Sequence, residues 1–90
     1  MYEILYSEEV IKENLPKIGE PWKTNIQNAI ESKLMTRPDI YGKPLRRSLK
    51  NYRKLRVGDY RVIFRIEDNL VKIFVVHHRS IVYQTASKRI

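Results

Sequence analysis

The side chains best suited to chemistry lie in the second half of the chain, and they are basic. Lys54 and Arg56 alternate along one expected strand, and Arg61 and Arg65 alternate along the next. Alternate residues of a strand point to the same face of a sheet, so these four side chains should share one face. A cationic face of this kind can bind the phosphates of a polyanion and stabilise charge that develops on them.

The distribution of charge along the chain supports the same interpretation. The chain has 90 residues, with 18 Lys and Arg against 10 Asp and Glu, and a formal net charge of +8. Residues 1–42 carry five basic and seven acidic side chains, whereas residues 43–90 carry thirteen basic and three acidic ones. This asymmetry predicts a polyanionic partner, either nucleic acid, an acidic protein, or both. A solvated charged surface is the simpler alternative.

The composition excludes several kinds of site. Because the chain has no Cys, it has no disulfide, no thiolate zinc site and no thiol nucleophile. The three acids of the second half, Asp59, Glu67 and Asp68, are expected in turns and not in the carboxylate cluster that a two-metal nuclease needs. His77 and His78 should point to opposite faces of a strand, so they cannot chelate one metal together. We therefore expect a site without metal or cofactor.

A basic, metal-free site suits the cleavage of RNA by its own 2′-hydroxyl group. The substrate supplies the nucleophile, so the protein needs a base, cationic donors for the phosphorane and a proton donor for the leaving 5′ oxygen. Lys54 is a candidate base, because the positive charges around it should favour its neutral amine. Arg61 and Arg79 suit the phosphate, since a guanidinium offers planar, bidentate donors. Tyr83 or His78 could move protons or stack on a base.

The elements that should position these residues form a single α+β domain over residues 1–90. Residues 2–6 are expected to be the first strand of a mainly antiparallel four-stranded sheet. A helical hairpin over residues 8–18 and 21–36 should cover one face of this sheet, with Ser7 as the first N-cap.

A loop is expected over residues 37–50, and a short helix or turn that carries Tyr83 over residues 80–88. Leu45 and Leu49 of the loop should reach the core. Its basic side chains should remain in solvent, namely those of Arg46, Arg47 and Lys50.

Gly58 and Asp59 predict a two-residue type II′ hairpin turn, in which Gly58 takes a positive φ. This turn sets the register of the two strands beside it, so that Lys54 opposes Ile63. The core face should then hold Leu55, Val57, Tyr60, Val62, Phe64 and Ile66, and the cationic face Tyr52, Lys54, Arg56, Arg61, Ile63 and Arg65.

A second two-residue turn is expected at Asp68 and Asn69, which pairs Phe64 with Ile73 and Val62 with Val75. His77 then ends on the core face. The side chains that join the cationic face are those of Lys72, Phe74, Val76 and His78. A slip of one residue would reverse this last strand.

The chain is not expected to enter a membrane. No apolar run approaches the length of a membrane span. Its first residues have neither the basic lead nor the long apolar stretch of a signal peptide. We therefore expect a small cytoplasmic protein.

Three segments resemble the RelE/ParE superfamily of bacterial type II toxins. Residues 55–64 read LRVGDYRVIF, residues 78–83 read HRSIVY, and residues 41–45 read YGKPL with Leu49 downstream. The resemblance covers nearly the whole chain and implies a RelE-like fold. For the RelE-like branch it also implies a toxin that cleaves messenger RNA, often in the ribosomal A site, and that a co-encoded acidic antitoxin neutralises.

The resemblance assigns roles to individual residues. Lys54 matches the strand lysine of the RelE-like branch and Arg61 its phosphate-binding arginine. Tyr83 matches the terminal tyrosine, and Arg79 matches a motif arginine four residues before it. His78 matches a histidine in the variant of this motif that reads His-Arg. Further RNA-binding side chains are expected at Arg46, Arg47, Lys50, Arg53, Arg56 and Arg65.

The chain departs from this pattern at Tyr52, where the branch often has a second basic residue. Arg53 is adjacent but should face the core side unless the strand bulges. Catalysis could therefore be weaker, or it could depend on another basic residue such as Arg46 or Arg47.

Three functions remain open at this point. The first is a RelE-type ribonuclease toxin. The second is a ParE-like toxin that inhibits DNA gyrase by binding it, without nuclease activity. The third is a relative in fold alone that binds RNA or an antitoxin, in which Lys54 and Arg56 are ordinary exposed strand residues and Tyr83 is a packing residue.

Overall fold

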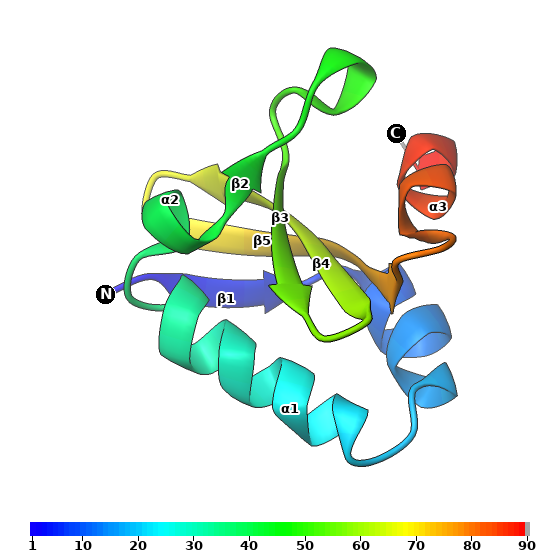
Figure 1. Cartoon of the computed structure of the whole chain (residues 1–90). Coiled ribbons are helices and arrows are strands. Elements are labelled where there is room, and N and C mark those ends of the chain that lie inside the picture. The colour runs from blue at the N-terminus through cyan, green and yellow to red at the C-terminus, as the bar shows by residue number, and fades with distance from the viewer. Residues whose placement is uncertain (90) are drawn as a thin grey trace.

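The computed structural model describes residues 1–89, which fold around one five-stranded sheet (Figure 1). The strand order is β1-β5-β4-β3-β2; β1 runs parallel to β5, and the other neighbours are antiparallel. The strands are β1 (Glu3–Tyr6), β2 (Lys43–Pro44), β3 (Arg53–Val57), β4 (Tyr60–Glu67) and β5 (Leu70–His78). The expected α+β fold is confirmed. The strand count was one too low, because Lys43 and Pro44 pair with β3 instead of lying in a loop.

Helical turns fill most of the chain outside the sheet. The α-helices are α1 (Trp22–Ala29), α2 (Pro38–Tyr41) and α3 (Val82–Arg89), and the shorter turns are η1 (Val10–Asn14), η2 (Leu15–Lys17), η3 (Ile30–Leu34) and η4 (Arg47–Leu49). Ser7 begins the first helical segment as expected, because its Oγ accepts a hydrogen bond from the Val10 N–H at 3.3 Å. No helix within residues 1–89 has the length and apolar character needed to cross a membrane.

The helical hairpin packs on one face of the sheet and forms the main core there. The residues buried in this core are Val10, Ile18, Ile26, Ile30 and Leu34 from the helical segments and Leu55, Val62, Phe64, Val71, Ile73 and Val76 from the strands. Val57, Tyr60 and Ile66 pack against them. The face predicted from the alternation along β3 and β4 is therefore the core face.

The hairpin between β3 and β4 has the predicted register, in which Lys54 lies opposite Ile63 and Val57 opposite Tyr60. Gly58 takes a φ of 59°, which a side chain rarely adopts. A Cβ at this position would also lie 2.3 Å from the Trp22 ring. The glycine thus permits both the turn and the close approach of α1.

The hairpin between β4 and β5 departs from the prediction at a β-bulge. Phe64 pairs with Ile73 as expected, but Ile63 then pairs with Val75, so that Phe74 is an extra residue in β5. The extra residue reverses the faces of all later positions. Val75 lies with Ile63 on the outer face, which is the face of the sheet opposite the helical hairpin. Val76 lies on the core face.

The two histidines are exchanged for the same reason. His77 lies opposite Arg61 and therefore on the outer face, and His78 lies opposite Tyr60 and therefore on the core face. The sequence predicted the reverse, and the one-residue shift of the bulge explains the error.

The sequence suggested that the outer face is open along its whole length, but part of it is covered. The helix α3 covers its centre and forms a second core of Leu49, Ile63, Val75, Val82 and Ala86. Leu45 packs against this core, so the two loop leucines do reach the interior, but on the outer side of the sheet. Ile63, predicted among the cationic side chains, is fully buried here.

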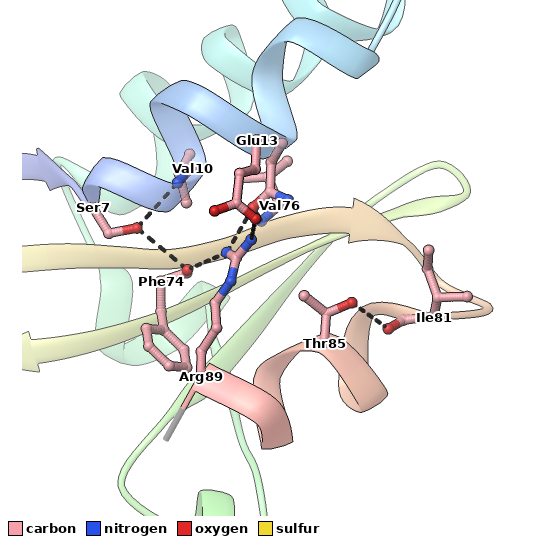
Figure 2. A network of polar contacts seen from close by, with 9 residues as sticks. Ser7, Val10, Glu13, Phe74, Val76, Ile81, Thr85 and Arg89 are labelled. Carbon is pink, nitrogen blue, oxygen red and sulfur yellow. Dashed lines mark hydrogen bonds and ion pairs between the residues drawn. The ribbon is translucent and has the colours of Figure 1, made fainter.

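A polar latch ties the end of α3 to strand β5 and to the helical turn η1 (Figure 2). The Nη1 of Arg89 donates hydrogen bonds to the Phe74 carbonyl at 3.1 Å and to Asn14 Oδ1 at 2.9 Å. The same Asn14 oxygen accepts the Val76 N–H at 3.2 Å, and Arg89 Nη2 lies 3.5 Å from Glu13 Oε1. Asn14 is 4% exposed, so the latch satisfies a polar group that would be costly to leave unpaired.

Candidate nucleic-acid interface

Lys54 and Tyr83 meet on the outer face although they come from different elements. Strand β3 directs Lys54 outward, because it lies opposite the outward-facing Ile63. Burial of Val82 anchors the first turn of α3, and this places the Tyr83 ring centroid 5.8 Å from Lys54 Nζ. Tyr83 remains 36% exposed. An ammonium group and a phenol are thus held side by side at the surface.

Two arginines extend this cationic site. Arg56 and Arg61 lie directly opposite each other on β3 and β4, and both line a cleft of about 280 Å³ together with Lys54. Arg61 Nη1 donates to the carbonyls of Gly58 and Tyr60, each at 2.9 Å. These bonds hold the guanidinium beside the turn and leave its other nitrogens available to an anion.

Arg79, which directly follows β5, reaches the same turn. Its backbone N–H donates to the Asp59 carbonyl at 2.8 Å, and its Nε lies 3.7 Å from Asp59 Oδ1. Both side chains of this ion pair are largely exposed, so the pair contributes little to stability and can open for a competing phosphate. Arg61 and Arg79 therefore flank one turn.

His78 is not brought together with Lys54 and Tyr83. Its ring packs edge-on against Tyr60 at a centroid distance of 5.8 Å, and its Nδ1 lies 2.9 Å from Ser80 Oγ. The predicted proton donor or stacking residue therefore lies on the helical side of the sheet. The β-bulge in β5 causes this placement of His78, and the residue types near the bulge do not predict the bulge.

His77, to which the sequence assigned no role, lies on the outer face opposite Arg61. Burial lowers the pKa of His77 from its ordinary value of 6.5, and the nearby charges of Lys17, Arg89 and His78 lower it further. The imidazole is therefore neutral at neutral pH, when it can accept a proton or a hydrogen bond.

The depressed pKa of His77 predicts a dependence of stability on pH. Below about pH 6.5 the unfolded chain binds a proton at this position before the folded chain does, so the free energy of unfolding should fall as the pH falls. His77→Asn should show a smaller loss over the same pH range. Urea denaturation of both proteins at neutral and mildly acidic pH measures this. Equal losses in the two proteins would assign the effect to other groups.

The predicted RNA-binding residues of the loop between β2 and β3 differ in their surroundings from Arg53, the first residue of β3. Arg46, Arg47 and Lys50 are exposed, as expected. Arg53 lies opposite Phe64, and its Nη1 donates to the carbonyls of Gly42 at 2.9 Å and Asp39 at 3.3 Å. Arg53 thus faces the core side, as predicted, and supports the segment before β2.

Arg65 and Tyr52 lie at the far end of the outer face. The Tyr52 ring stacks on Phe74 at a centroid distance of 4.9 Å, and the Arg65 guanidinium lies 5.6 Å from the Tyr52 centroid. Arg65 and Lys72 both pair with Glu67, which is the last residue of β4 and not a turn residue. Their hydrogen bonds, that of Arg65 first, lower the pKa of the Glu67 carboxyl. The Glu67 carboxylate therefore compensates the charge of Arg65. Within residues 1–89, Arg61 forms no ion pair of this kind.

The chemistry available at the interface is that of amines, guanidinium groups and phenols. Within residues 1–89, no group of three or more His, Asp or Glu side chains is arranged to hold a metal ion. The cationic groups gathered near Lys54 can bind a phosphate, and Tyr83 can donate a proton or a hydrogen bond.

Comparison with known proteins relates this arrangement to a family. Residues 4–83 match the family model described as the ParE toxin of the type II toxin-antitoxin system, parDE. Over 44 residues the chain is 39% identical to Toxin RelE of Mycobacterium tuberculosis; this match covers 49% of the chain and 45% of the relative, so it spans about half of each.

Two solved structures share the fold. The toxin-antitoxin complex RelBE2 of M. tuberculosis matches with a TM-score of 0.73 and 28% identity, over 87% of this chain and 98% of that chain. A mutant of E. coli toxin RelE in the free state matches with a TM-score of 0.73 and 27% identity, over 99% of this chain and 97% of that chain. Because the family model spans most of its length, this chain belongs to the RelE/ParE superfamily of type II toxins.

Proposed function

We propose that this protein is a RelE-type toxin that acts in the cytoplasm as a metal-independent messenger RNA endoribonuclease associated with the ribosome. The observation that carries the proposal is the approach of Lys54 Nζ to within 5.8 Å of the Tyr83 ring centroid, beside the cleft that Arg61 lines. The sequence similarity to Toxin RelE supports it.

The proposed reaction uses the 2′-hydroxyl of the RNA as the nucleophile. Lys54 acts as the general base that takes the 2′ proton, and the 2′ oxygen attacks the adjacent phosphorus. Arg61 and Arg79 stabilise the extra negative charge of the phosphorane. The bond from phosphorus to the 5′ oxygen then breaks, and Tyr83 gives its proton to that oxygen. The products are a 2′,3′-cyclic phosphate and a 5′-hydroxyl end.

No carboxylate is among the described residues that line the cleft beside Lys54, Arg56 and Arg61. A phosphate that enters the cleft therefore meets cations that no carboxylate of the cleft neutralises. This charge balance supports the binding of a phosphate at the proposed site.

The test is to express the protein in bacterial cells and to map the ends of their messenger RNA. We expect cleaved messages with 5′-hydroxyl ends. In a purified assay with and without ribosomes, an RNA with a single 2′-deoxy sugar at the cleaved position should resist cleavage, whereas the same RNA with the deoxy sugar one position away should not. Growth arrest with intact messages would reject the nuclease.

We also propose that an acidic antitoxin neutralises this toxin. The excess of basic side chains in residues 43–90 provides the charge complementarity. The matched M. tuberculosis structure is itself a toxin-antitoxin complex. A short acidic reading frame beside the gene, whose product restores growth when it is co-expressed, is the expected finding.

A ParE-like toxin that inhibits DNA gyrase by binding is the second candidate, and the ParE family match favours it. Such a function needs no catalytic group. DNA supercoiling after induction separates the two, because gyrase inhibition relaxes plasmid DNA and leaves messages intact. If alanine at Lys54, Arg61 and Tyr83 leaves growth inhibition unchanged, and induction alters neither messages nor supercoiling, the third possibility, a relative in fold alone, is favoured.

A further inference from the structure

The cleft beside the candidate site extends beyond the residues that the proposed reaction uses. It passes round the edge of β3, where β2 pairs only with Arg53 and Lys54. The side chains that line it are Lys33, Tyr41, Lys43, Lys54, Leu55, Arg56 and Arg61. Five of these seven are cations. Within residues 1–89 none of the five takes part in an ion pair, in contrast to Arg65, Lys72 and Arg79.

The sheet places like charges directly opposite each other at this cleft. Lys43 lies opposite Lys54 in the β2–β3 pair, and Arg56 lies opposite Arg61 in the β3–β4 pair. Like charges at such positions destabilise a sheet. Local arrangements that oppose stability are expected at functional sites, where a ligand of opposite charge relieves the repulsion.

Lys33 and Tyr41 add a different kind of contact from the helical side. Lys33 belongs to η3, and its Nζ lies 5.7 Å from the ring centroid of Tyr41, the last residue of α2. Tyr41 is 47% exposed, so part of its ring surface is free to stack. The combination of an exposed aromatic ring and cations on a concave surface is typical of sites that bind single-stranded nucleic acid.

The backbone holds Tyr41 and Lys43 firmly in this position. Gly42 lies between them against the core, where an added Cβ would be 2.1 Å from Phe64 Cζ and 2.9 Å from the Pro38 carbonyl oxygen. The Gly42 carbonyl also accepts a hydrogen bond from Arg53 at 2.9 Å. The backbone from which the two side chains project is therefore preorganised, which lowers the entropy lost when a ligand binds.

We propose that Lys33, Tyr41 and Lys43 form a second nucleotide subsite, which holds a backbone phosphate and a base of the single-stranded RNA that flanks the cleaved bond. This inference rests on the proposed nuclease function and deepens it. Lys33 and Lys43 bind the phosphate, and Tyr41 stacks on the base. An acidic peptide would pair with the same cations but has no base to stack on the Tyr41 ring, so RNA affinity and antitoxin affinity distinguish the two occupants.

The experiment measures RNA binding apart from cleavage. A single-stranded RNA with 2′-O-methyl groups throughout cannot be cleaved through its 2′ oxygen, so its affinity can be followed as the NaCl concentration is raised. Each phosphate contact contributes about 0.7 to the slope of log K against log salt. The double variant Lys33→Gln with Lys43→Gln should reduce this slope by about 0.7, because both lysines bind the same phosphate. Tyr41→Ala should weaken binding by about 5- to 100-fold and leave the slope unchanged.

The matched control is the double variant Lys12→Gln with Lys23→Gln, which removes the same charge from the helical segments outside the cleft. It should keep the wild-type slope. If the cleft variant cleaves unmodified RNA and binds like this control, the subsite is wrong and the nuclease stands. If the cleft variant shows the smaller slope but the wild-type protein cleaves no RNA, the subsite stands as a binding site and the nuclease is wrong. Loss of antitoxin affinity with unchanged RNA binding would also overturn the subsite.

Discussion

Arg61→Ala should reduce the rate of messenger RNA cleavage by about 10²–10³-fold, the effect of removing one donor that stabilises charge in the transition state. Arg61 is suited to this role because backbone carbonyls hold it by one nitrogen only, and because no carboxylate of residues 1–89 pairs with it. Single-turnover cleavage with saturating enzyme measures the chemical step and separates it from the loss of one phosphate contact in binding.

Two controls accompany the Arg61 variant. Arg61→Lys keeps the charge and loses the bidentate geometry, so it should recover only part of the rate. Lys12→Ala removes a positive charge from an exposed side chain of η1 and should cleave like the wild type. Arg61→Ala with a wild-type rate and an unchanged thermal midpoint would remove Arg61 from the site.

Arg89→Ala should lower the free energy of unfolding by about 2–4 kcal/mol and should also slow cleavage. The guanidinium is 11% exposed and bonds to both the Phe74 carbonyl and Asn14 Oδ1. Its removal leaves the buried Asn14 oxygen and the half-buried Phe74 carbonyl with fewer partners. Because the same helix carries Tyr83, a loosened α3 should hold the phenol less firmly beside Lys54.

The effect of Arg89 should be seen in stability and in local opening together. Urea denaturation gives the loss of stability, and hydrogen exchange should show faster exchange in α3 than in β4. Lys88→Ala is the matched control, because it removes a positive charge from the neighbouring exposed residue of the same helix. If the two variants unfold at the same urea concentration, the latch does not stabilise the helix.

Local chemistry was enough to predict the elements that carry the candidate site. Gly58 can adopt a positive φ, so the turn and hence the register of β3 against β4 follow from two adjacent residue types. The alternation of apolar and basic residues then assigns Lys54 and Arg56 to one face and Leu55 to the other. The helical hairpin follows in the same way from the spacing of its apolar residues.

Which residues come together at the site could not be predicted, because this depends on contacts between residues far apart in the chain. The bulge at Phe74 exchanges the faces of His77 and His78, and the Phe74 carbonyl at the bulge accepts hydrogen bonds from Ser7 and Arg89, which are distant in the chain. The approach of Tyr83 to Lys54 likewise depends on the packing of α3 against the sheet.

From its amino-acid order alone, this protein could be assigned a basic hairpin, a helical hairpin and membership of a toxin superfamily, since turn preference and side-chain alternation act within a few residues. Packing between distant segments decided the rest. It placed α3 over Ile63, brought Tyr83 to Lys54, and turned Lys33 and Lys43 toward one cleft. Such choices depend on which buried surfaces fit together, and that free energy is spread over the whole fold.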